Sequence, residues 1–382
     1  MAGLYLHIPF CTQRCVYCDF YFVTTRRSYT SFVQAMCHEI EAYAHTYAAL
    51  EPVDTIYLGG GTPSLLHTDE IYRLLNAVHD HFDTSQVQEV TLELNPEDAD
   101  VDTLRAYRGM GIDRLSIGIQ SFFAEDLAFM NRSHTPEEAE AIIPLARQAG
   151  FDNFSVDLIF GLPDQPLEYW GANLQKVIRL EVPHLSAYNL EVMEHTVLWK
   201  RVQRGLVTFI GDEAMLDRYR LALDLLRAGG YEQYEISSFC RDGQRALHNQ
   251  NYWRHKNYLG FGPSAHSLWW KGLPAKRWSN MRNLRIYETL LAQHDRPVDE
   301  ELHLLLDELA EEYILLSLRT AEGINLAWLN RNYGVDLLYE KADEVEALID
   351  QGYVASPTDG HIRLTDEGKL VCDAVTARLA LD

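Results

Sequence analysis

The stretch LYLHIPFCTQRCVYCDFYF, residues 4–22, decides the fold of this chain. It carries Cys11, Cys15 and Cys18 in the spacing C-x3-C-x2-C, directly after the short β-type run LYLHI. Three thiolates on one tight loop can bind three irons of a [4Fe–4S] cube and leave the fourth iron open to a substrate or cofactor. Phe20 stands two residues after Cys18, so no fourth thiol follows there. The stretch therefore predicts a cluster site with one open iron.

A zinc knuckle is the alternative for the same three cysteines. Structural zinc sites have four closed ligands and favour cysteine pairs spaced C-x2-C. No second pair follows downstream, and His7, which could complete a set of four, lies in the strand that precedes the loop. The cluster is therefore the favoured interpretation, with zinc as the alternative.

The composition is that of an ordinary soluble globular protein. The 382 residues are 47% hydrophobic and 23% charged, a length that suits two or three domains. The chain has neither a run of about 18 apolar residues nor a signal-peptide pattern at its start. We therefore expect no transmembrane segment and a cytoplasmic location, where free cysteines and an oxygen-sensitive cluster persist. The other three cysteines are predicted to be small buried hydrophobic residues: Cys37, Cys240 and Cys372.

Strands and helices alternate through the first half of the chain. The predicted strands after LYLHI are 53–58, 90–94, 114–119, 153–160 and 184–190, and the predicted helices are 28–49, 69–82, 100–109, 136–149 and 166–180. This order predicts a parallel α/β sheet with crossover helices. The polar motifs follow the strands, so we expect them to meet at the carboxyl edge of the sheet. Periodicity alone leaves open whether the sheet closes into a barrel.

The second half of the chain changes character. A helix is predicted at about 210–230 and a strand at YEQYEISSF (231–239), followed by a loop-rich, aromatic segment at 241–283. A further helix and the polar run DRPVDE (295–300) indicate a boundary. The predicted domains are therefore a cluster-binding domain at 1–240, a connecting segment at 241–299 and a C-terminal domain at 300–382.

The C-terminal domain resembles a winged helix. Its predicted helices, at 302–317, 325–333 and 339–351, precede a hairpin-like segment and a closing helix. Winged helices often bind DNA, but residues 301–382 contain 17 Asp or Glu and 6 Lys or Arg, a net charge of −11. The whole chain has a net charge of −23, whereas binding to a phosphate backbone requires a basic face. A protein-interaction or lid module is therefore favoured, and no nucleic-acid partner is expected.

Polar residues and glycines at the strand ends are the remaining site candidates. The triplet Gly59-Gly60-Gly61 lets a backbone approach a ligand without an intervening Cβ, although a tight turn also explains it. Asp157 lies in an otherwise apolar strand, where a buried carboxylate needs partners. Glu93 could be a ligand contact or a surface charge, and Tyr5 a ligand contact or a core aromatic residue. The full set is Tyr5, Gly60, Gly61, Thr62, Glu93, Gln120, Arg132 and Asp157.

The cysteine spacing, GGGTP (59–63) and ELNP (93–96) together resemble the radical S-adenosylmethionine (SAM) superfamily. The resemblance implies a partial (β/α)6 barrel and a SAM molecule whose amino and carboxylate groups bind the open iron. It implies that the glycine triplet grips the methionine amino group and that Glu93 meets the ribose hydroxyls. It further implies that Arg132 contacts the SAM carboxylate. Gln120 and Asp157 would form hydrogen bonds to the ribose or the adenine, and Tyr5 would lie next to SAM.

Within this superfamily, residues 4–382 resemble the oxygen-independent coproporphyrinogen III oxidases and their relatives, including the segment GFGPSAHS (260–267). The oxidases have a fourth cysteine where this chain has Phe20. HNQNYW (248–253) matches the HNxxYW motif of the haem-chaperone branch, HemW, which implies that His248 binds haem iron. Imidazole is a standard axial donor, but a hydrogen-bonded loop histidine is the alternative. His266 is a secondary candidate, and His255 fits a ligand and a surface residue equally.

The resemblance leads to two main hypotheses. In the first, the chain is a haem chaperone that binds haem, one [4Fe–4S] cluster and SAM, and delivers haem to respiratory haemoproteins, some of them membrane-associated. In the second, it is a radical SAM enzyme that decarboxylates the propionates of coproporphyrinogen III or a related tetrapyrrole. A scaffold with a degenerate SAM site is the least favoured reading. Phe20 and the HNxxYW motif favour the chaperone; whether SAM is cleaved and whether the chain forms a homodimer stay open.

Overall fold

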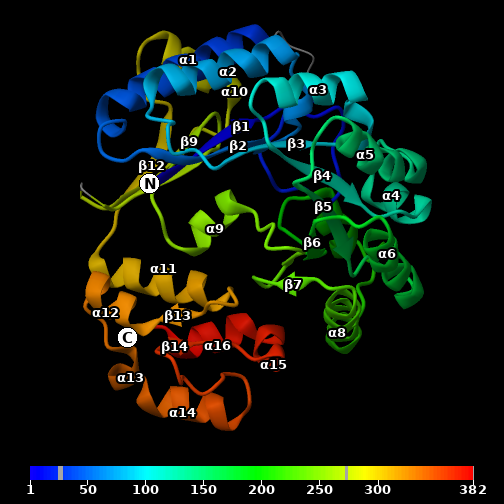
Figure 1. Cartoon of the computed structure of the whole chain (residues 1–382), viewed down its shortest axis with the longest axis vertical. Helices are drawn as coiled ribbons and strands as arrows, with labels where there is room; N and C mark the ends of the chain where they lie inside the picture. Colours follow the sequence, from blue (N-terminus) through cyan, green and yellow to red (C-terminus); the bar gives the residue numbers. More distant parts are fainter. Residues whose placement is uncertain (25–28, 272–273, 382) are drawn as a thin grey trace.

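Six parallel strands, side by side in chain order, form the centre of the molecule (Figure 1). The computed structural model describes residues 1–24, 29–271 and 274–381. The sheet has β12 at one end and β7 at the other, so it curves without closing. This confirms the predicted partial (β/α)6 barrel. The six strands are β1 (Ala2–Ile8), β2 (Val53–Gly60), β3 (Glu89–Leu94), β4 (Arg114–Gln120), β5 (Phe154–Phe160) and β6 (His184–Asn189).

Crossover helices cover the outer face of the sheet. At α5 the structure has the helix start that the sequence predicts: Pro136 occupies the first turn, and Thr135 and Glu138 form a capping box. Two short helices, α4 and α7, were not predicted. The helices of this part are α1 (Tyr29–Tyr47), α2 (Thr68–His81), α3 (Val101–Gly109), α4 (Ala124–Met130), α5 (Pro136–Gln148), α6 (Leu167–Arg179), α7 (Val197–Gln203) and α8 (Asp212–Ala228).

The two faces of the sheet differ in chemistry because side chains alternate along each strand. Leu4, Leu6 and Ile8 of β1 are buried in one large apolar core with the helices. The opposite alternation carries polar groups, among them Glu93 and Asp157, which line a cavity on the inner face. The curved sheet therefore encloses a polar interior.

Residues 241–283, predicted to be loop-rich, include short strands that extend the sheet. They form α9 (Leu247–Trp253), β9 (Tyr258–Phe261), β10 (His266–Trp269) and β11 (Lys276–Asn280). β9 pairs in parallel with β1, and β10 and β11 follow in antiparallel order. These strands were missed because each has only four or five residues. After α10 (Leu284–Ala292), the polar run DRPVDE leads into the exposed edge strand β12 (Val298–His303).

The segment YEQYEISSF forms two strands rather than the one predicted. β7 (Glu232–Gln233) and β8 (Ser238–Cys240) pair as an antiparallel hairpin. The Glu235 carboxylate accepts a hydrogen bond from the backbone N–H of Ser237, which stabilises the turn between them. This hydrogen bond lies within the turn that separates the two strands.

The C-terminal unit has its own apolar core, centred on Ile314, Leu329 and Leu348. A two-stranded sheet, extended by a bridge between Val354 and Leu364, forms its wing. The unit lies beyond α9 from the large sheet in Figure 1. Its elements are α11 (Leu306–Leu318), β13 (Ile324–Asn325), α12 (Leu326–Tyr333), α13 (Leu337–Glu340), α14 (Ala342–Asp350), β14 (His361–Ile362), α15 (Asp366–Leu370) and α16 (Cys372–Leu379).

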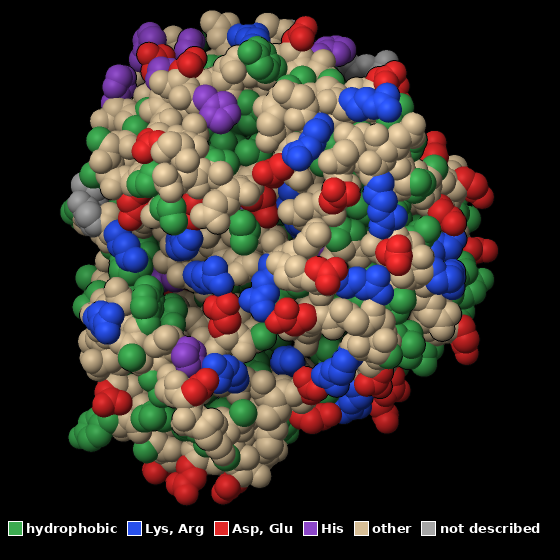
Figure 2. Space-filling view, in the orientation of Figure 1, with side chains coloured by type: hydrophobic (Ala, Val, Ile, Leu, Met, Phe, Trp, Pro, Cys, Tyr) green, Lys and Arg blue, Asp and Glu red, His purple; other side chains and the backbone are tan. Residues whose placement is uncertain are grey.

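Charges of both signs mix on the face shown in Figure 2, and acidic side chains gather at the tip of the C-terminal unit. Such a face is unlike the continuous basic surface that binds nucleic acid. Among the residues that the structure describes, no helix has the length and apolar character needed to cross a membrane.

Candidate functional site

The cysteine loop between β1 and α1 is held in place by the end of α4. The backbone N–H of Val16 donates to the Met130 carbonyl at 3.1 Å, and Asn131 Nδ2 donates to the Arg14 carbonyl at 2.7 Å. Asn131 has a left-handed backbone (φ 58°), which ends α4 and turns its side chain to the loop. These contacts therefore fix the position of the loop against α4.

The three thiols lie at the mouth of the curved sheet. Thr62 Oγ1 donates to Cys11 Sγ at 3.7 Å, and Arg132 Nη1 donates to Cys15 Sγ at 3.4 Å. Burial raises the pKa of Cys11 to about 11 and that of Cys18 to about 12. Thiols with such pKa values become thiolates at neutral pH only when a metal binds them, which is how metal sites couple to deprotonation.

The three thiols need not converge on one point in order to bind a [4Fe–4S] cube. Over 1–24, 29–271 and 274–381, no three His, Cys, Asp or Glu side chains converge closely enough to bind a single metal ion. In a [4Fe–4S] cube each cysteine binds a different iron, so convergence on one point is not required. The donors Thr62 and Arg132 beside the sulfurs also fit the charge of such a cluster.

The glycine triplet lets the end of β2 pass against the cysteine loop. The Gly61 N–H donates to the Ile8 carbonyl at 2.8 Å, and a Cβ on Gly61 would lie 2.7 Å from the Phe10 carbonyl oxygen. Gly60 has φ +109°, and a Cβ there would lie 2.5 Å from His7 Nδ1. Contacts within the chain therefore require glycine at both positions, whether or not a ligand also approaches the backbone there.

Glu93 is bound from both sides at the end of β3. Its Oε1 accepts a hydrogen bond from the Tyr57 hydroxyl at 2.7 Å, and its Oε2 accepts one from the Gly60 N–H at 3.0 Å. Burial, with a smaller contribution from the charge of Asp157, raises the pKa of Glu93 to about 7. A carboxylate with two fixed donors still has free lone pairs, so it can accept hydrogen bonds from hydroxyl groups of a ligand.

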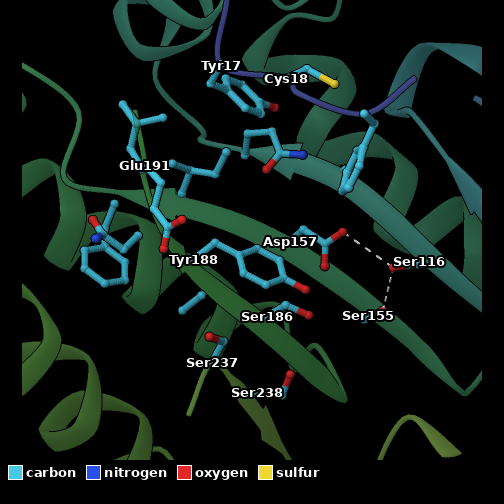
Figure 3. Close-up of a pocket in the computed structure, with 18 of the residues that line it drawn as sticks. Tyr17, Cys18, Ser116, Ser155, Asp157, Ser186, Tyr188, Glu191, Ser237 and Ser238 are labelled. Atoms are coloured by element: carbon cyan, nitrogen blue, oxygen red, sulfur yellow. Dashed lines mark hydrogen bonds between the residues drawn. The ribbon is translucent and has the colours of Figure 1, made fainter. Parts of the chain in front are cut away.

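Asp157 points into the same cavity from β5 (Figure 3). Ser116 Oγ donates to Asp157 Oδ2 at 3.5 Å, and Ser155 Oγ donates to Ser116 Oγ at 3.1 Å. Burial raises the pKa of Asp157 to about 6. The deep part of the cavity is therefore lined by hydroxyl and carboxyl groups, which suit a hydrogen-bonding ligand.

Arg132 joins the cluster loop to the ends of β3 and β4. Its Nη2 donates to Asn95 Oδ1 at 2.6 Å and to the Gly118 carbonyl at 2.8 Å, while its buried Nε has no partner. Gln120, on the same cavity wall, has a left-handed backbone (φ 67°) at a register shift between β4 and β5. Such a conformation in a non-glycine residue is typical of functional sites. A fixed cation beside the cluster loop fits a ligand that carries a carboxylate.

One cavity of roughly 910 Å³ brings these groups together. Its volume is at the upper end of the range for small-molecule sites, so it has room for more than one group. The C-terminal unit contributes one of its walls. Ten of the predicted site residues line it: Cys11, Cys15, Cys18, Gly60, Gly61, Thr62, Glu93, Gln120, Arg132 and Asp157.

Tyr5 does not line this cavity. Its hydroxyl lies 3.1 Å from His7 Nδ1, and its ring packs 6.0 Å from the ring of Tyr57. Tyr5 therefore lies one layer behind Tyr57, which contacts Glu93 directly. Its role beside SAM stays a prediction.

His248 does not line the cavity either. Its side chain is 1% exposed, its Nδ1 lies 2.9 Å from Thr55 Oγ1, and its Nε2 lies 2.9 Å from the Tyr252 hydroxyl. Burial lowers the pKa of His248 to about 3, so the ring is neutral. Iron ligation would require the ring to leave both partners, and it stays a prediction.

The two other candidate histidines also lie outside the cavity lining. His266 is exposed at the start of β10. His255 is 1% exposed, and its ring nitrogens lie 2.6 Å from the Tyr333 hydroxyl and 3.1 Å from Glu312 Oε2. The surface reading of His255 is therefore wrong, because this side chain is buried where α9 meets the C-terminal unit.

Sequence reasoning missed two residues that hold the site together, Tyr57 and Asn95. Tyr57 fixes Glu93, and Asn95 fixes Arg132. Strand alternation gives a signal for Tyr57, since it shares the inner face of β2 with the glycine turn two residues later. Asn95 lies two residues after Glu93, where β3 ends, and no pattern distinguishes it from a turn residue.

A curved parallel sheet with three cysteines at its mouth and a polar cavity below them defines a radical SAM protein. A sequence profile described as the radical SAM superfamily matches residues 5–177, and one described as the HemN C-terminal domain matches residues 304–371. The solved structure of coproporphyrinogen III oxidase (HemN) from Escherichia coli matches with a TM-score of 0.84 at 24% identity, covering 99% of this chain and 90% of that one. This match shows the shared fold.

Curated relatives give the narrower assignment. The protein named "Heme chaperone HemW" of Mycobacterium tuberculosis is 34% identical, covering 99% of this chain and 94% of that protein. Its namesake in Escherichia coli is 38% identical, covering 69% of each chain. A Bos taurus protein, "Radical S-adenosyl methionine domain-containing protein 1, mitochondrial", is 32% identical, covering 99% and 87%. The chain therefore belongs to the HemW family of the radical SAM superfamily.

Proposed function

We propose that this chain is a haem chaperone that binds one [4Fe–4S] cluster, SAM and haem, and delivers haem to acceptor haemoproteins. The observation that carries the proposal is the 34% identity to a heme chaperone HemW along nearly the whole length of both chains. The coproporphyrinogen III oxidase is less similar, at 24% identity. Phe20, which is 66% exposed at the cavity, stands where the oxidases have their fourth cysteine.

The residues of the cavity fit the two cofactors of the superfamily. Cys11, Cys15 and Cys18 would bind the cluster, and the cation of Arg132 would bind the carboxylate of SAM. Glu93, fixed by Tyr57, would accept hydrogen bonds from the ribose hydroxyls. When bound, the cluster and SAM supply one-electron chemistry, which the protein directs by position.

Further polar residues would complete the SAM site. Gln120 and Asp157 would bond the ribose or the adenine, and Gly60, Gly61 and Thr62 would form the wall at the methionine end. Tyr57 separates Tyr5 from Glu93, so Tyr5 would support this wall from behind. We include His248 as the proposed iron ligand, with the condition that its ring first leaves Thr55 and Tyr252.

The test uses anaerobic protein reconstituted with iron and sulfide, in the presence of SAM. The protein should bind haem with a Soret band at a stoichiometry of one, and should pass that haem to an apo-haemoprotein. The expected recipients in the cell are respiratory haemoproteins, including membrane-associated ones. Under the same reducing conditions the protein should not convert coproporphyrinogen III to protoporphyrinogen IX; efficient conversion would overturn the proposal.

A further inference from the structure

The cavity has a second wall, which the C-terminal unit supplies. Arg319, at the end of α11, and Lys369, on α15, line it together with the apolar side chains of Leu370 and Val371. Trp253, from the end of α9, lines the cavity next to this wall. This wall therefore combines apolar surface with two cations, unlike the hydroxyl-lined interior of the sheet.

The helix α9 has two faces with different tasks. On one face, Asn251 Nδ2 donates to Asp54 Oδ1 at 2.9 Å, and the Glu89 carboxylate accepts hydrogen bonds from the first N–H groups of the helix. His248 lies on this face, bonded to β2, so binding the iron of a haem in the cavity would require its ring to leave this face of the helix. The opposite face presents Trp253 to the cavity, together with Asn249 one turn earlier. The HNxxYW motif therefore anchors the helix through His248 and Asn251 and lines the cavity with Asn249 and Trp253.

Arg319 is positioned by Trp253 rather than by a strong ion pair. The Arg319 guanidinium lies over the Trp253 ring at 5.7 Å. Its acidic partner, Asp373, lies at 3.3 Å and is 94% exposed. An ion pair so open to water is weak, so a carboxylate of a ligand can replace Asp373 at little cost. The guanidinium can bind such a carboxylate with two parallel hydrogen bonds.

Lys369 is the second cation on this wall. Its Nζ donates to Gln233 Oε1 at 2.9 Å and to Asp366 Oδ1 at 3.0 Å. Arg319 and Lys369 thus place two cations on this side of the cavity, each beside an aspartate that is partly or fully open to water.

We infer that the haem site is the part of the cavity that Trp253 and the C-terminal wall line together, where the porphyrin packs on Trp253 and the propionates bind Arg319 and Lys369 beside it. The inference rests on the proposed function. A planar ring with apolar faces and two carboxylates at one edge matches an aromatic side chain flanked by cations. The deep interior suits it less, because an apolar ring would offer no partner to the hydrogen-bonding capacity that Ser116, Ser155 and Asp157 leave unused among themselves.

The experiment compares haem with its dimethyl ester, in which both propionates lack charge. Dissociation constants are measured by Soret titration on cluster-loaded protein with SAM. The wild type should bind haem about tenfold or more tightly than the ester, as expected for charge-assisted hydrogen bonds. The variant Arg319→Met/Lys369→Met keeps the apolar stems, so it should bind both compounds with the affinity that the wild type has for the ester. Arg319→Lys should regain part of the preference.

Two controls keep the result specific. Arg331→Met removes an exposed arginine of α12 outside the cavity and should leave the preference unchanged. The cluster content and SAM affinity of the double variant should equal those of the wild type, because neither residue touches the cluster loop. Equal binding of haem and ester by the wild type, or a preference that survives in the double variant, would overturn the inference alone. A wild type that binds neither compound would overturn the proposed function as well.

Discussion

Arg132 and Cys15, 117 positions apart in the chain, are joined by a hydrogen bond from the guanidinium Nη1 to the thiol sulfur at 3.4 Å. The same guanidinium binds Asn95 from β3 at 2.6 Å. One cation therefore ties the cluster loop to the mouth of the sheet. A SAM carboxylate bound beside this loop would meet a fixed positive charge.

Replacing Arg132 by glutamine should weaken SAM binding more than cluster assembly. The variant loses a charge-assisted contact, so we expect the SAM dissociation constant to rise about tenfold or more. Equilibrium dialysis on reconstituted protein measures this constant, and iron analysis measures the cluster. Arg105→Gln, which removes an exposed arginine paired with Asp102, is the matched control. Unchanged SAM affinity in the Arg132 variant would remove this residue from the site.

Cys15→Ala should abolish the brown cluster absorbance and most of the bound iron, because two thiolates cannot hold the cube on this loop. Cys37→Ala, which removes a thiol on α1 whose sulfur lies 4.0 Å from the Arg73 carbonyl, should retain the full cluster. Both variants are compared by absorbance and by iron and sulfide content. A Cys15 variant with full iron content would contradict the cluster assignment.

Glu93→Gln should change how stability depends on pH. Burial raises the pKa of Glu93 from 4.5 to about 7, so between these values the folded protein holds a proton that the unfolded chain has lost. The wild type therefore loses stability as pH rises through this window. A neutral glutamine removes this loss. Between pH 5 and pH 8 the free energy of unfolding of the variant should therefore rise by about 2 kcal/mol relative to that of the wild type, and by less to the extent that water screens the site.

Urea denaturation of the ligand-free proteins at several pH values measures the effect. The loss of the Gly60 hydrogen bond in the variant shifts its free energy of unfolding by the same amount at every pH. The test therefore compares how steeply the free energy of unfolding changes with pH in the two proteins. Parallel stability curves for the two proteins would show that Glu93 is ionised in the folded state throughout this range.

His248→Ala should destabilise the fold, since it removes a buried ring that is bonded to Thr55 and Tyr252. We expect a loss of about 2–4 kcal/mol, typical of a buried hydrogen-bonded side chain replaced by a cavity. Thermal and urea unfolding measure the loss, and the Soret band is recorded on the same samples. A variant with wild-type stability but a displaced or missing Soret band would instead assign His248 to the haem iron.

The sequence predicts the inner half of the fold better than its periphery. Strands such as β2 and β5 are long apolar runs followed by glycine, and α5 has both its start and stop signals, so their prediction rests on strong local preferences. β9 and β10 could not be predicted, because strands of four residues become strands only through pairing with β1 and β11.

The candidate site follows the same division. Cys11, Cys15 and Cys18 are recognisable because the chemistry of the cluster sets their spacing, and Glu93 and Asp157 because each closes or interrupts an apolar strand. The sequence gives no indication that the C-terminal unit forms a wall of the cavity. Arg319 and Trp253 meet only through the packing of α11 against the end of α9, and no local pattern encodes a contact across 66 residues.

Haem transfer tests the central claim most directly. Cluster-loaded protein with SAM and one equivalent of haem is mixed anaerobically with an apo-haemoprotein, and both Soret bands are followed. The account predicts that haem moves from this protein to the acceptor faster than it moves from a non-specific carrier to the same acceptor. It also predicts that coproporphyrinogen III in a parallel sample stays unchanged. Failure to bind haem, or decarboxylation of coproporphyrinogen III, would contradict it.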